Sequence, residues 1–287
     1  MRTVRERNSE NRTSVIRARS GWFDIDLFDL WNYRDLILLF VRRDFVSIYK
    51  QTVLGPLWYL LQPLFTTLVF TVIFGNIAGI PTDGLPPVLF YMTGIVAWGY
   101  FSGCLTKTAD TFVGNAAIFG KVYFPRLVVP VSSVISNIIT FIIQFVLLLC
   151  FILYFYLNGS LIQPNYWILL TPLIIIYMAA LGLGAGILIS SLTTKYRDLA
   201  FTVGFGVQLW MYATPIVYPI SQVPEKWRWV SALNPMTAAV ETFRYAFLGV
   251  GTVEPDMWGY GTVIVLVTLG LGILLFSRTE KNFMDTV

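Results

Sequence analysis

The sequence has no histidine, only two cysteines and little charge. Of its 287 residues, 13% are Asp, Glu, Lys or Arg, whereas 56% are apolar. A soluble domain of ordinary composition is about 25% charged, and the mean hydropathy here is +0.69. Cys104 and Cys150 both lie in apolar runs, which predicts packing roles and no disulfide framework. These features indicate an integral membrane protein.

Charge is missing most completely from six apolar windows. A helix needs about 20 mainly apolar residues to cross about 30 Å of hydrocarbon. The windows near this length are 57–79, 87–104, 127–157, 166–192, 200–218 and 258–276. We therefore expect an all-α membrane protein with six transmembrane helices and both termini on the same side.

The absence of charged residues and histidine from these windows limits the mechanism. Proton relays inside a bilayer use Asp, Glu, His, Lys or Arg, so a proton-driven pump is disfavoured. Acid–base and metal-dependent membrane enzymes are disfavoured for the same reason, whereas sodium sites built from carbonyls stay open. The sequence also has no G-x-x-x-x-G-K-[ST] loop. If cargo moves uphill, another polypeptide must supply the energy.

Positive charge is concentrated near the start of the chain. Residues 1–50 hold ten of the 20 lysines and arginines, and the positive-inside rule places them in the cytoplasm. The same orientation puts seven more inside: Lys107, Lys121, Arg126, Lys195, Arg197, Arg278 and Lys281. Three remain outside, namely Lys226, Arg228 and Arg244. We expect cytoplasmic termini, with residues 1–28 forming a flexible tail.

Residues 29–56 predict an amphipathic helix at the inner membrane interface. The polar side of the helical wheel holds Asn32, Asp35, Arg42, Arg43 and Lys50, and the opposite side holds Ile37, Leu38, Val41, Phe45 and Ile48. Two interpretations stay open. The helix is either a lipid anchor or a surface that docks a cytoplasmic partner.

Two further connections predict short helices. Residues 109–119 favour a helix in the inner loop 105–126, acting as a plain connector or as a lever. Outside, Asn234 and Pro235 are typical of a helix start and Gly249 of its end. A re-entrant pair of half-helices between spans 5 and 6 satisfies their backbone groups, and Glu241 and Arg244 are spaced to pair.

Aromatic residues make up 16% of the chain. Trp and Tyr at span ends form interfacial belts, and Phe in mid-span faces lipid or the core; the alternative is a path on which sugar rings stack. Gly182, Gly184 and Gly186 predict close helix packing.

Several short segments, in order, resemble a known family. They are residues 49–58 (YKQTVLGPLW), Gln62 with Pro63, residues 119–126 (FGKVYFPR), residues 195–198 (KYRD), residues 214–219 (TPIVYP), and Asn234 with Pro235 followed by Phe243 and Arg244. Over residues 29–287 the chain is similar to ABC-2 type transport permeases of the polysaccharide-export group. Residues 57–287 would then be the six-span transmembrane domain.

The resemblance implies a transport subunit that is not itself an enzyme. Such permeases are homodimers that work with two copies of a separate ATPase subunit, which binds ATP and magnesium. They export lipid-diphosphate-linked polysaccharide, such as O antigen, capsule or teichoic acid, across the bacterial inner membrane. No cofactor, metal site or nucleic-acid contact is implied for this chain, and membrane lipids surround it.

The resemblance also implies roles for particular residues. A channel between spans 1 and 5 of each copy, with span 2 beside them, would be lined by Trp58, Tyr59, Phe65, Phe70, Phe74, Tyr91, Trp98, Phe201, Phe205, Gln208, Trp210 and Tyr212. The lipid diphosphate would meet Arg42, Arg43 and Lys50, whose other interpretation is membrane topology and anionic lipid. The ATPase would dock at Asp35, Asp44, Asp110 and Asn115. Rival functions are an ABC-2 exporter of drugs or small lipids, and a membrane scaffold without transport activity.

Overall fold

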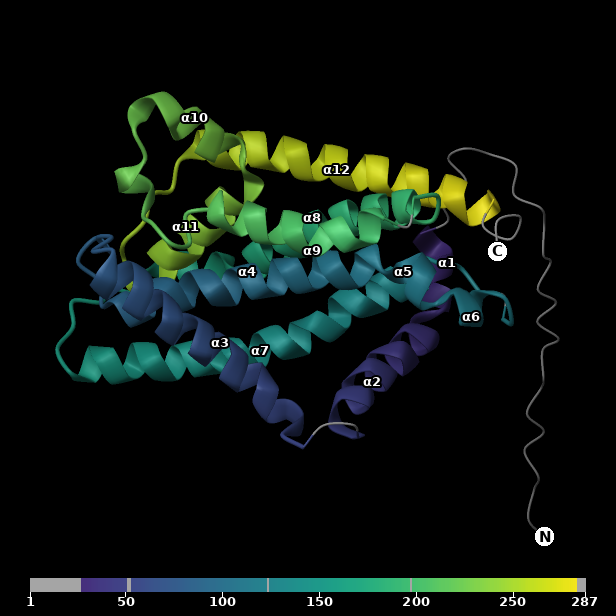
Figure 1. Ribbon diagram of the computed structural model, residues 1–287, viewed down its shortest axis with the longest axis horizontal. Helices are drawn as coiled ribbons and strands as arrows, with labels where there is room; N and C mark the ends of the chain where they lie inside the picture. Colours follow the sequence, from purple (N-terminus) through teal and green to yellow (C-terminus); the bar gives the residue numbers. More distant parts are fainter. Residues whose placement is uncertain (1–26, 51–52, 123, 197, 283–287) are drawn as a thin grey trace, which may run out of the picture.

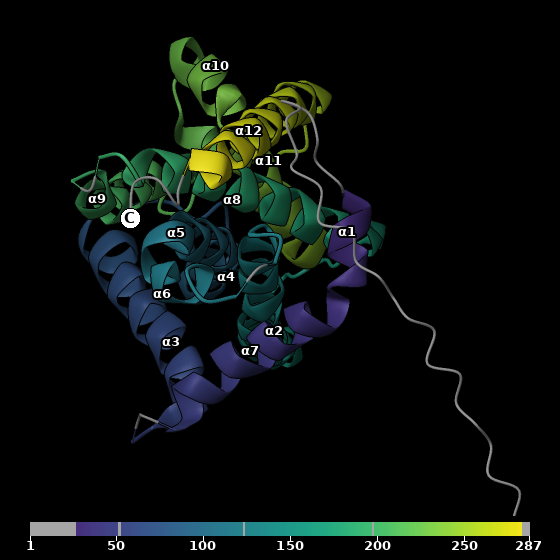
Figure 2. The same ribbon diagram turned by 90° about the vertical axis from the view of Figure 1, so that its right-hand side faces the viewer.

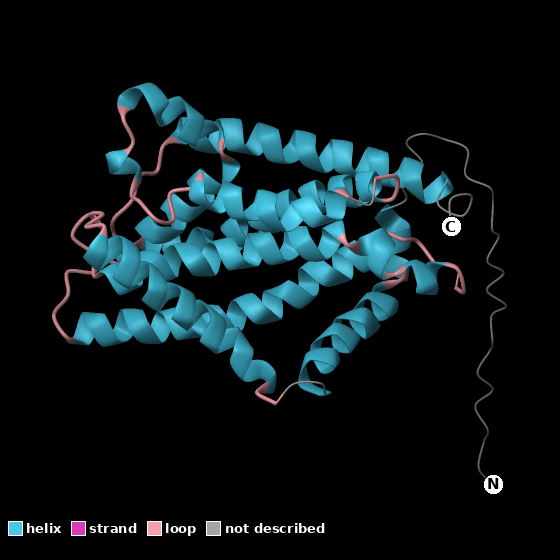
Figure 3. Cartoon of the chain, viewed as in Figure 1, coloured by secondary structure: helices cyan, strands magenta, loops and turns pink. Residues whose placement is uncertain are grey.

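A computed structural model describes residues 27–50, 53–122, 124–196 and 198–282. Over these residues all regular structure is helical (Figure 3). The tail predicted for residues 1–28 lies outside the described residues, apart from its last two, and the last five residues of the chain lie outside them as well.

Among the described residues, five helices are long and apolar enough to cross a membrane: Gly55–Ile77, Pro87–Ala109, Val128–Leu157, Tyr166–Thr193 and Pro255–Glu280. The first contains α3 (Trp58–Phe70) and a π-helical continuation, Thr71–Ile77. The others correspond to α4 (Pro87–Ala109), α7 (Val128–Leu157), α8 (Thr171–Thr193) and α12 (Pro255–Asn282). α4, α8 and α12 run roughly along the long axis of the molecule, and α3 crosses it obliquely (Figure 1). The protein is therefore a multi-pass membrane protein, and five of the six predicted windows are long helices.

The remaining window, 200–218, contains a shorter helix. α9 (Leu199–Tyr212) has 14 residues, which rise about 21 Å and fall short of the hydrocarbon thickness. Turns at residues 213–218 then lead to α10 (Glu225–Leu233) and α11 (Pro235–Leu248) at one end of the bundle (Figure 1). Six membrane crossings stay a prediction, as do the sides on which the termini lie.

α4 is the centre of the bundle. In its apolar stretch 78% of the residues are buried, and its most extensive contacts are with α8 and α7. α8 also packs along α12. Cys104 lies in this core, whereas Cys150 on α7 is exposed, so the packing role predicted for Cys150 is wrong.

The glycines of α8 allow helices to approach on two sides. A Cβ added at Gly182 would lie 2.7 Å from the Cβ of Cys104 on α4, and one at Gly186 would lie 2.7 Å from the carbonyl oxygen of Leu105. A Cβ at Gly184 would instead lie 2.7 Å from the Cα of Leu269 on α12. The predicted close packing is confirmed, but it involves two neighbours rather than one face.

At the end of the bundle opposite α10 and α11, short helices gather (Figures 1 and 2). The predicted amphipathic helix is divided at Tyr33 into α1 (Leu27–Asn32) and α2 (Arg34–Lys50). The predicted helix 109–119 is two single turns, α5 (Thr111–Gly114) and α6 (Ala116–Phe119). The break between them falls at Asn115, next to Gly114, and both residue types are weak helix formers.

α2 packs on the protein through part of its apolar side. Ile37 and Phe40 are buried against a cluster that includes Phe124 and Val128. Leu38, predicted on the same apolar side, is 62% exposed. The side chains of Ile48 and Tyr49 lie outside the described residues. The helix therefore combines a protein contact with an exposed apolar strip.

Candidate functional site

α3 is held loosely against the bundle. Only 17% of its apolar stretch is buried, against 78% in the neighbouring α4. Pro63, Thr67 and Phe70 form its buried side, whereas Trp58 and Phe65 are 50% and 60% exposed. Much of this membrane helix is thus left uncovered by the part of the chain that the structure describes.

α9 is more exposed still, since none of its residues is buried. Phe201, Phe205, Leu209 and Tyr212 are all exposed, and their spacing puts them on one face of the helix. A Cβ added at Gly204 or Gly206 would meet nothing within 4 Å. Much of this aromatic face is therefore left uncovered by the described residues.

Amide side chains accompany these aromatics. Gln62 on α3 and Gln208 on α9 are exposed, although both helices are apolar. Both helices contact α4 and lie toward the same side of the bundle (Figure 2). Polar side chains in a membrane usually face another protein surface or a water-filled cavity, because lipid leaves them without hydrogen-bond partners. The two helices together form a surface suited to a second subunit or an aqueous path.

The structure divides the predicted channel residues into three groups. The exposed ones are Trp58, Phe65, Phe201, Phe205, Gln208 and Tyr212, and the half-buried ones are Tyr59, Phe74 and Trp210. Phe70, Tyr91 and Trp98 are buried within the core. These last three present no surface to a channel in this structure, because the rings of Phe70 and Tyr91 pack edge to face and Trp98 packs on Phe101. For all twelve residues, a channel role stays a prediction.

α11 fixes the end of α9 that lies near it. The side chain of Asn234 caps α11 by accepting a hydrogen bond from the backbone N–H of Met236 at 3.1 Å. The same side-chain oxygen accepts a hydrogen bond from the indole N–H of Trp210 at 3.0 Å. The NH₂ group of Asn234 donates to the hydroxyl of Thr214 at 2.9 Å. One residue thus both starts α11 and holds the end of α9.

A buried ion pair holds the turns at residues 213–218, which follow α9. The Arg244 side chain is 1% exposed and donates to the Glu241 carboxylate at 2.6 Å and to the carbonyl oxygen of Pro215 at 3.0 Å. Its guanidinium also lies 3.8 Å from the centroid of the Phe90 ring on α4. Glu241 accepts a second hydrogen bond from the N–H of Thr252 at 3.1 Å. The predicted pairing of Glu241 with Arg244 is confirmed, and Arg244 is the largest fully buried side chain among the described residues; its place on the outer side of the membrane stays a prediction.

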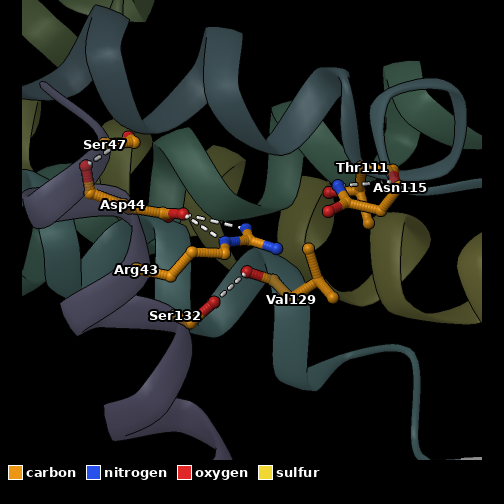
Figure 4. Close-up of polar contacts among 7 residues, drawn as sticks. All are labelled: Arg43, Asp44, Ser47, Thr111, Asn115, Val129 and Ser132. Carbon is orange, nitrogen blue, oxygen red and sulfur yellow. Dashed lines mark hydrogen bonds and ion pairs between the residues drawn. The ribbon is translucent and has the colours of Figure 1, made fainter. Parts of the chain in front are cut away.

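The cationic residues predicted to meet a lipid diphosphate lie on α2. Arg42 and Lys50 are exposed. Arg43 makes two hydrogen bonds to Asp44, at 3.0 and 2.8 Å (Figure 4), and its guanidinium lies 4.7 Å from the Phe40 ring centroid. Arg43, a predicted phosphate contact, is thus paired with Asp44, a predicted ATPase contact. Exposed pairs of this kind are weak, so either partner is available for another ligand.

The other predicted docking residues lie at the same end of the bundle. Asp35 is exposed on α2, and Asn115 donates to the carbonyl oxygen of Thr111 at 3.1 Å (Figure 4). Asp110 is exposed as a whole, but its carboxylate folds against Gly114, and this partial burial raises its pKa above the ordinary value for aspartate. The structure does not gather the four residues into one cluster through any contact it records.

The described residues contain no group of three or more His, Cys, Asp or Glu side chains placed to hold a metal ion.

The residues that organise the site are Asn234 and Arg244, which the channel prediction did not include. The Asn–Pro start signal located Asn234, but the contacts with Trp210 and Thr214 depend on tertiary packing. For Arg244, the only sequence signal was its spacing from Glu241.

Comparison with known proteins gives the same picture over most of the chain. An O-antigen export system permease protein, RfbA of Klebsiella pneumoniae, is 29% identical over 253 residues, which are 88% of this chain and 94% of that protein. RfbA of Myxococcus xanthus is 27% identical over 90% of this chain and 98% of its own length. The polysialic acid transport protein KpsM of Escherichia coli is 21% identical over 81% of this chain and 89% of its own.

The family match covers the helices that form the site. Residues 35–248 match the ABC-2 type transporter family, a stretch that begins in α2 and ends with α11. It includes the exposed faces of α3 and α9 and the residues that hold them. The chain is a permease that belongs to the ABC-2 type transporter family.

Proposed function

We propose that this chain is the membrane subunit of an ATP-driven exporter of lipid-linked polysaccharide in the bacterial inner membrane. Two relatives carry the name O-antigen export permease and a third is a polysialic acid transport protein. The observation that carries the proposal is that α3 and α9 expose aromatic and amide side chains on one side of the bundle.

The exposed faces support a homodimer with a central path. Two copies that bring α3 and α9 together would cover these faces and enclose Gln62 and Gln208. Aromatic rings such as Phe201 and Phe205 would offer stacking surfaces to sugar rings without a deep binding well. Energy would come from two copies of an ATPase subunit that binds ATP and magnesium and docks near Asp35, Asp44, Asp110 and Asn115.

The test is deletion of the gene in its host. We expect lipid-linked polymer to accumulate in the cytoplasm and to disappear from the cell surface, with recovery when the wild-type gene is restored. Normal polymer at the surface would reject the proposal in favour of the rivals, an exporter of drugs or small lipids or a scaffold without transport activity.

The cations of α2 allow a sharper test. Arg42 and Lys50 are exposed beside the apolar strip of α2, where a diphosphate at the inner leaflet would lie. Replacing Arg42 and Arg43 by glutamine is expected to lower export while ATPase binding and basal ATP hydrolysis persist. Unchanged export would leave these cations with a role in topology alone.

A further inference from the structure

A cavity of about 470 Å³ lies between α3 and its neighbours α4 and α7. One wall is a stripe along α3 that includes Leu61, Leu64 and Leu68. These residues follow one another at the spacing of a single helical face. The cavity is distinct from the exposed aromatic face of α9, none of whose residues lines it.

The opposite wall comes from two other membrane helices. Val88 and Met92 of α4 and Phe151 of α7 complete the lining. The accessible surface inside the cavity is almost wholly carbon, since the polar residues of the lining, Thr67 and Thr71, expose hardly any oxygen to it. A ligand in this cavity would be held by hydrocarbon contact alone.

A cavity of this size and chemistry favours a hydrocarbon occupant. Protein interiors contain few voids larger than a water molecule, and an apolar cavity gives water no hydrogen-bond partners. The volume falls within the range of small-molecule sites. Because the walls belong to candidate membrane spans, the medium that surrounds them supplies alkyl chains.

The mouth of the cavity opens away from the bundle. Phe65 and Leu68 line the cavity and are each 60% exposed, and Val72 at its far end is 41% exposed. A chain from the bilayer therefore reaches the cavity sideways. From Leu61 to Val72, the span that contains α3 rises about 16 Å. A lipid acyl chain is of similar length, since it covers one leaflet, about 15 Å of a 30 Å hydrocarbon core.

We propose that this cavity binds one acyl chain of a membrane phospholipid. The chain lies along α3 and fills the space between α3 and the α4–α7 pair. It thereby supports a helix that makes few contacts of its own with the protein. This inference does not depend on the export function.

The test is photolabelling of the full chain in lipid nanodiscs. The probe is a phosphatidylcholine with a diazirine on one acyl chain, and labelled residues are mapped by mass spectrometry. We expect labelling of Met92 and Phe151, which lie at the inner wall. Leu68→Trp fills the cavity and should reduce labelling of these two residues several-fold. Val69→Trp, which places the same side chain on an exposed position beside the cavity lining, should leave it unchanged.

Other outcomes would overturn the proposal. Labelling of Met92 that Leu68→Trp does not reduce would mean that lipid reaches this wall without entering the cavity. Displacement of the label by polyprenyl phosphate but not by unlabelled phosphatidylcholine would assign the cavity to a different lipid. A disulfide between two copies of a Leu68→Cys variant would mean that a second subunit covers the mouth. If Leu68→Trp does not fold, Leu61→Phe narrows the same cavity and is judged by the same labelling.

Discussion

The span that contains α3, Gly55–Ile77, and the neighbouring α4 are apolar and of equal length, 23 residues each, yet they differ in how they pack on the rest of the molecule. Residues of α4 are buried over 78% of its apolar stretch, and those of α3 over only 17%. α4 is enclosed by α7, α8 and α11, whereas α3 contacts mainly α4 and α7. Hydropathy alone does not separate the two helices.

The difference separates a region whose side chains are packed within one subunit from a region whose side chains are largely exposed. Around α4, backbone and side chains fit closely, and the buried Arg244 has partners on three elements. Along α3 and α9, aromatic and amide groups have no protein neighbour on one side. The first region is built to be stable within one subunit, and the second is suited to a partner, a lipid or cargo.

The largest effect is expected from the buried ion pair beside α4. Removing one partner with Arg244→Met leaves the charge of Glu241 buried, which costs about 3–5 kcal/mol. We expect a large fall in the midpoint of thermal unfolding, measured for the purified protein in detergent. The double variant Glu241→Leu with Arg244→Met should be more stable than the single variant. If the single and double variants are equally unstable, the unpaired charge of Glu241 is not the cause of the lost stability.

The next effect concerns the close packing of α8 on α4. Gly186→Leu inserts a side chain where the carbonyl oxygen of Leu105 lies, and overpacking of this kind costs about 1–3 kcal/mol or more. The control is Gly204→Leu on α9, where a Cβ meets nothing, and this variant should fold normally. Yield and monodispersity on size-exclusion chromatography report the result. If the two variants had the same yield and monodispersity, the close packing of α8 on α4 and the exposure of α9 would not be the difference that the structure indicates.

A smaller loss is expected where the two regions meet. Asn234→Ala removes the cap of α11 and the hydrogen bonds to Trp210 and Thr214, and loss of a cap costs about 0.5–2 kcal/mol. Asn234→Asp keeps the capping oxygen but not the NH₂ donors, so it should restore the stability of α11. A spin label at position 212 should become more mobile in Asn234→Ala, and less so in Asn234→Asp, which keeps the oxygen that accepts from Trp210. Unchanged mobility would show that other contacts hold the end of α9.

The smallest effect on stability belongs to the exposed aromatics. Phe201→Ala and Phe205→Ala remove side chains that are 87% and 64% exposed. The free energy of unfolding should therefore change by less than about 0.5 kcal/mol. If the proposed function holds, surface polymer should nevertheless fall several-fold. Leu153→Ala on α7, which is 58% exposed, serves as the matched control and should leave export unchanged. A loss of stability at Phe201 would mean that α9 packs within the chain.

Much of the fold is predictable because the bilayer imposes one requirement on every span. Runs of apolar residues located α7, α8 and α12, and local capping signals located α11 between Asn234 and Gly249. The break at Asn115 is also local, but the apolar residues around it masked the signal. Helix position in a membrane protein is thus largely a property of the segment itself.

The site is less predictable because its residues act through distant neighbours. A phenylalanine in a membrane helix has the same sequence signal whether it faces lipid, the core or a path, so Phe70 and Phe65 could not be distinguished. Arg244 carries a charge that predicts exposure, and its burial depends on Phe90 and Pro215, which come from other parts of the chain. In each case the neighbouring residues determine whether the side chain is buried.

The glycines of α8 have a consequence for how the bundle tolerates change. Because Gly182 and Gly184 let the helix approach two neighbours at backbone distance, the spacing between α4, α8 and α12 is determined by main-chain atoms. Replacing outward-facing side chains leaves that spacing unaltered. The lipid-facing surface is therefore free to diverge with membrane composition, while the three-helix scaffold keeps its dimensions.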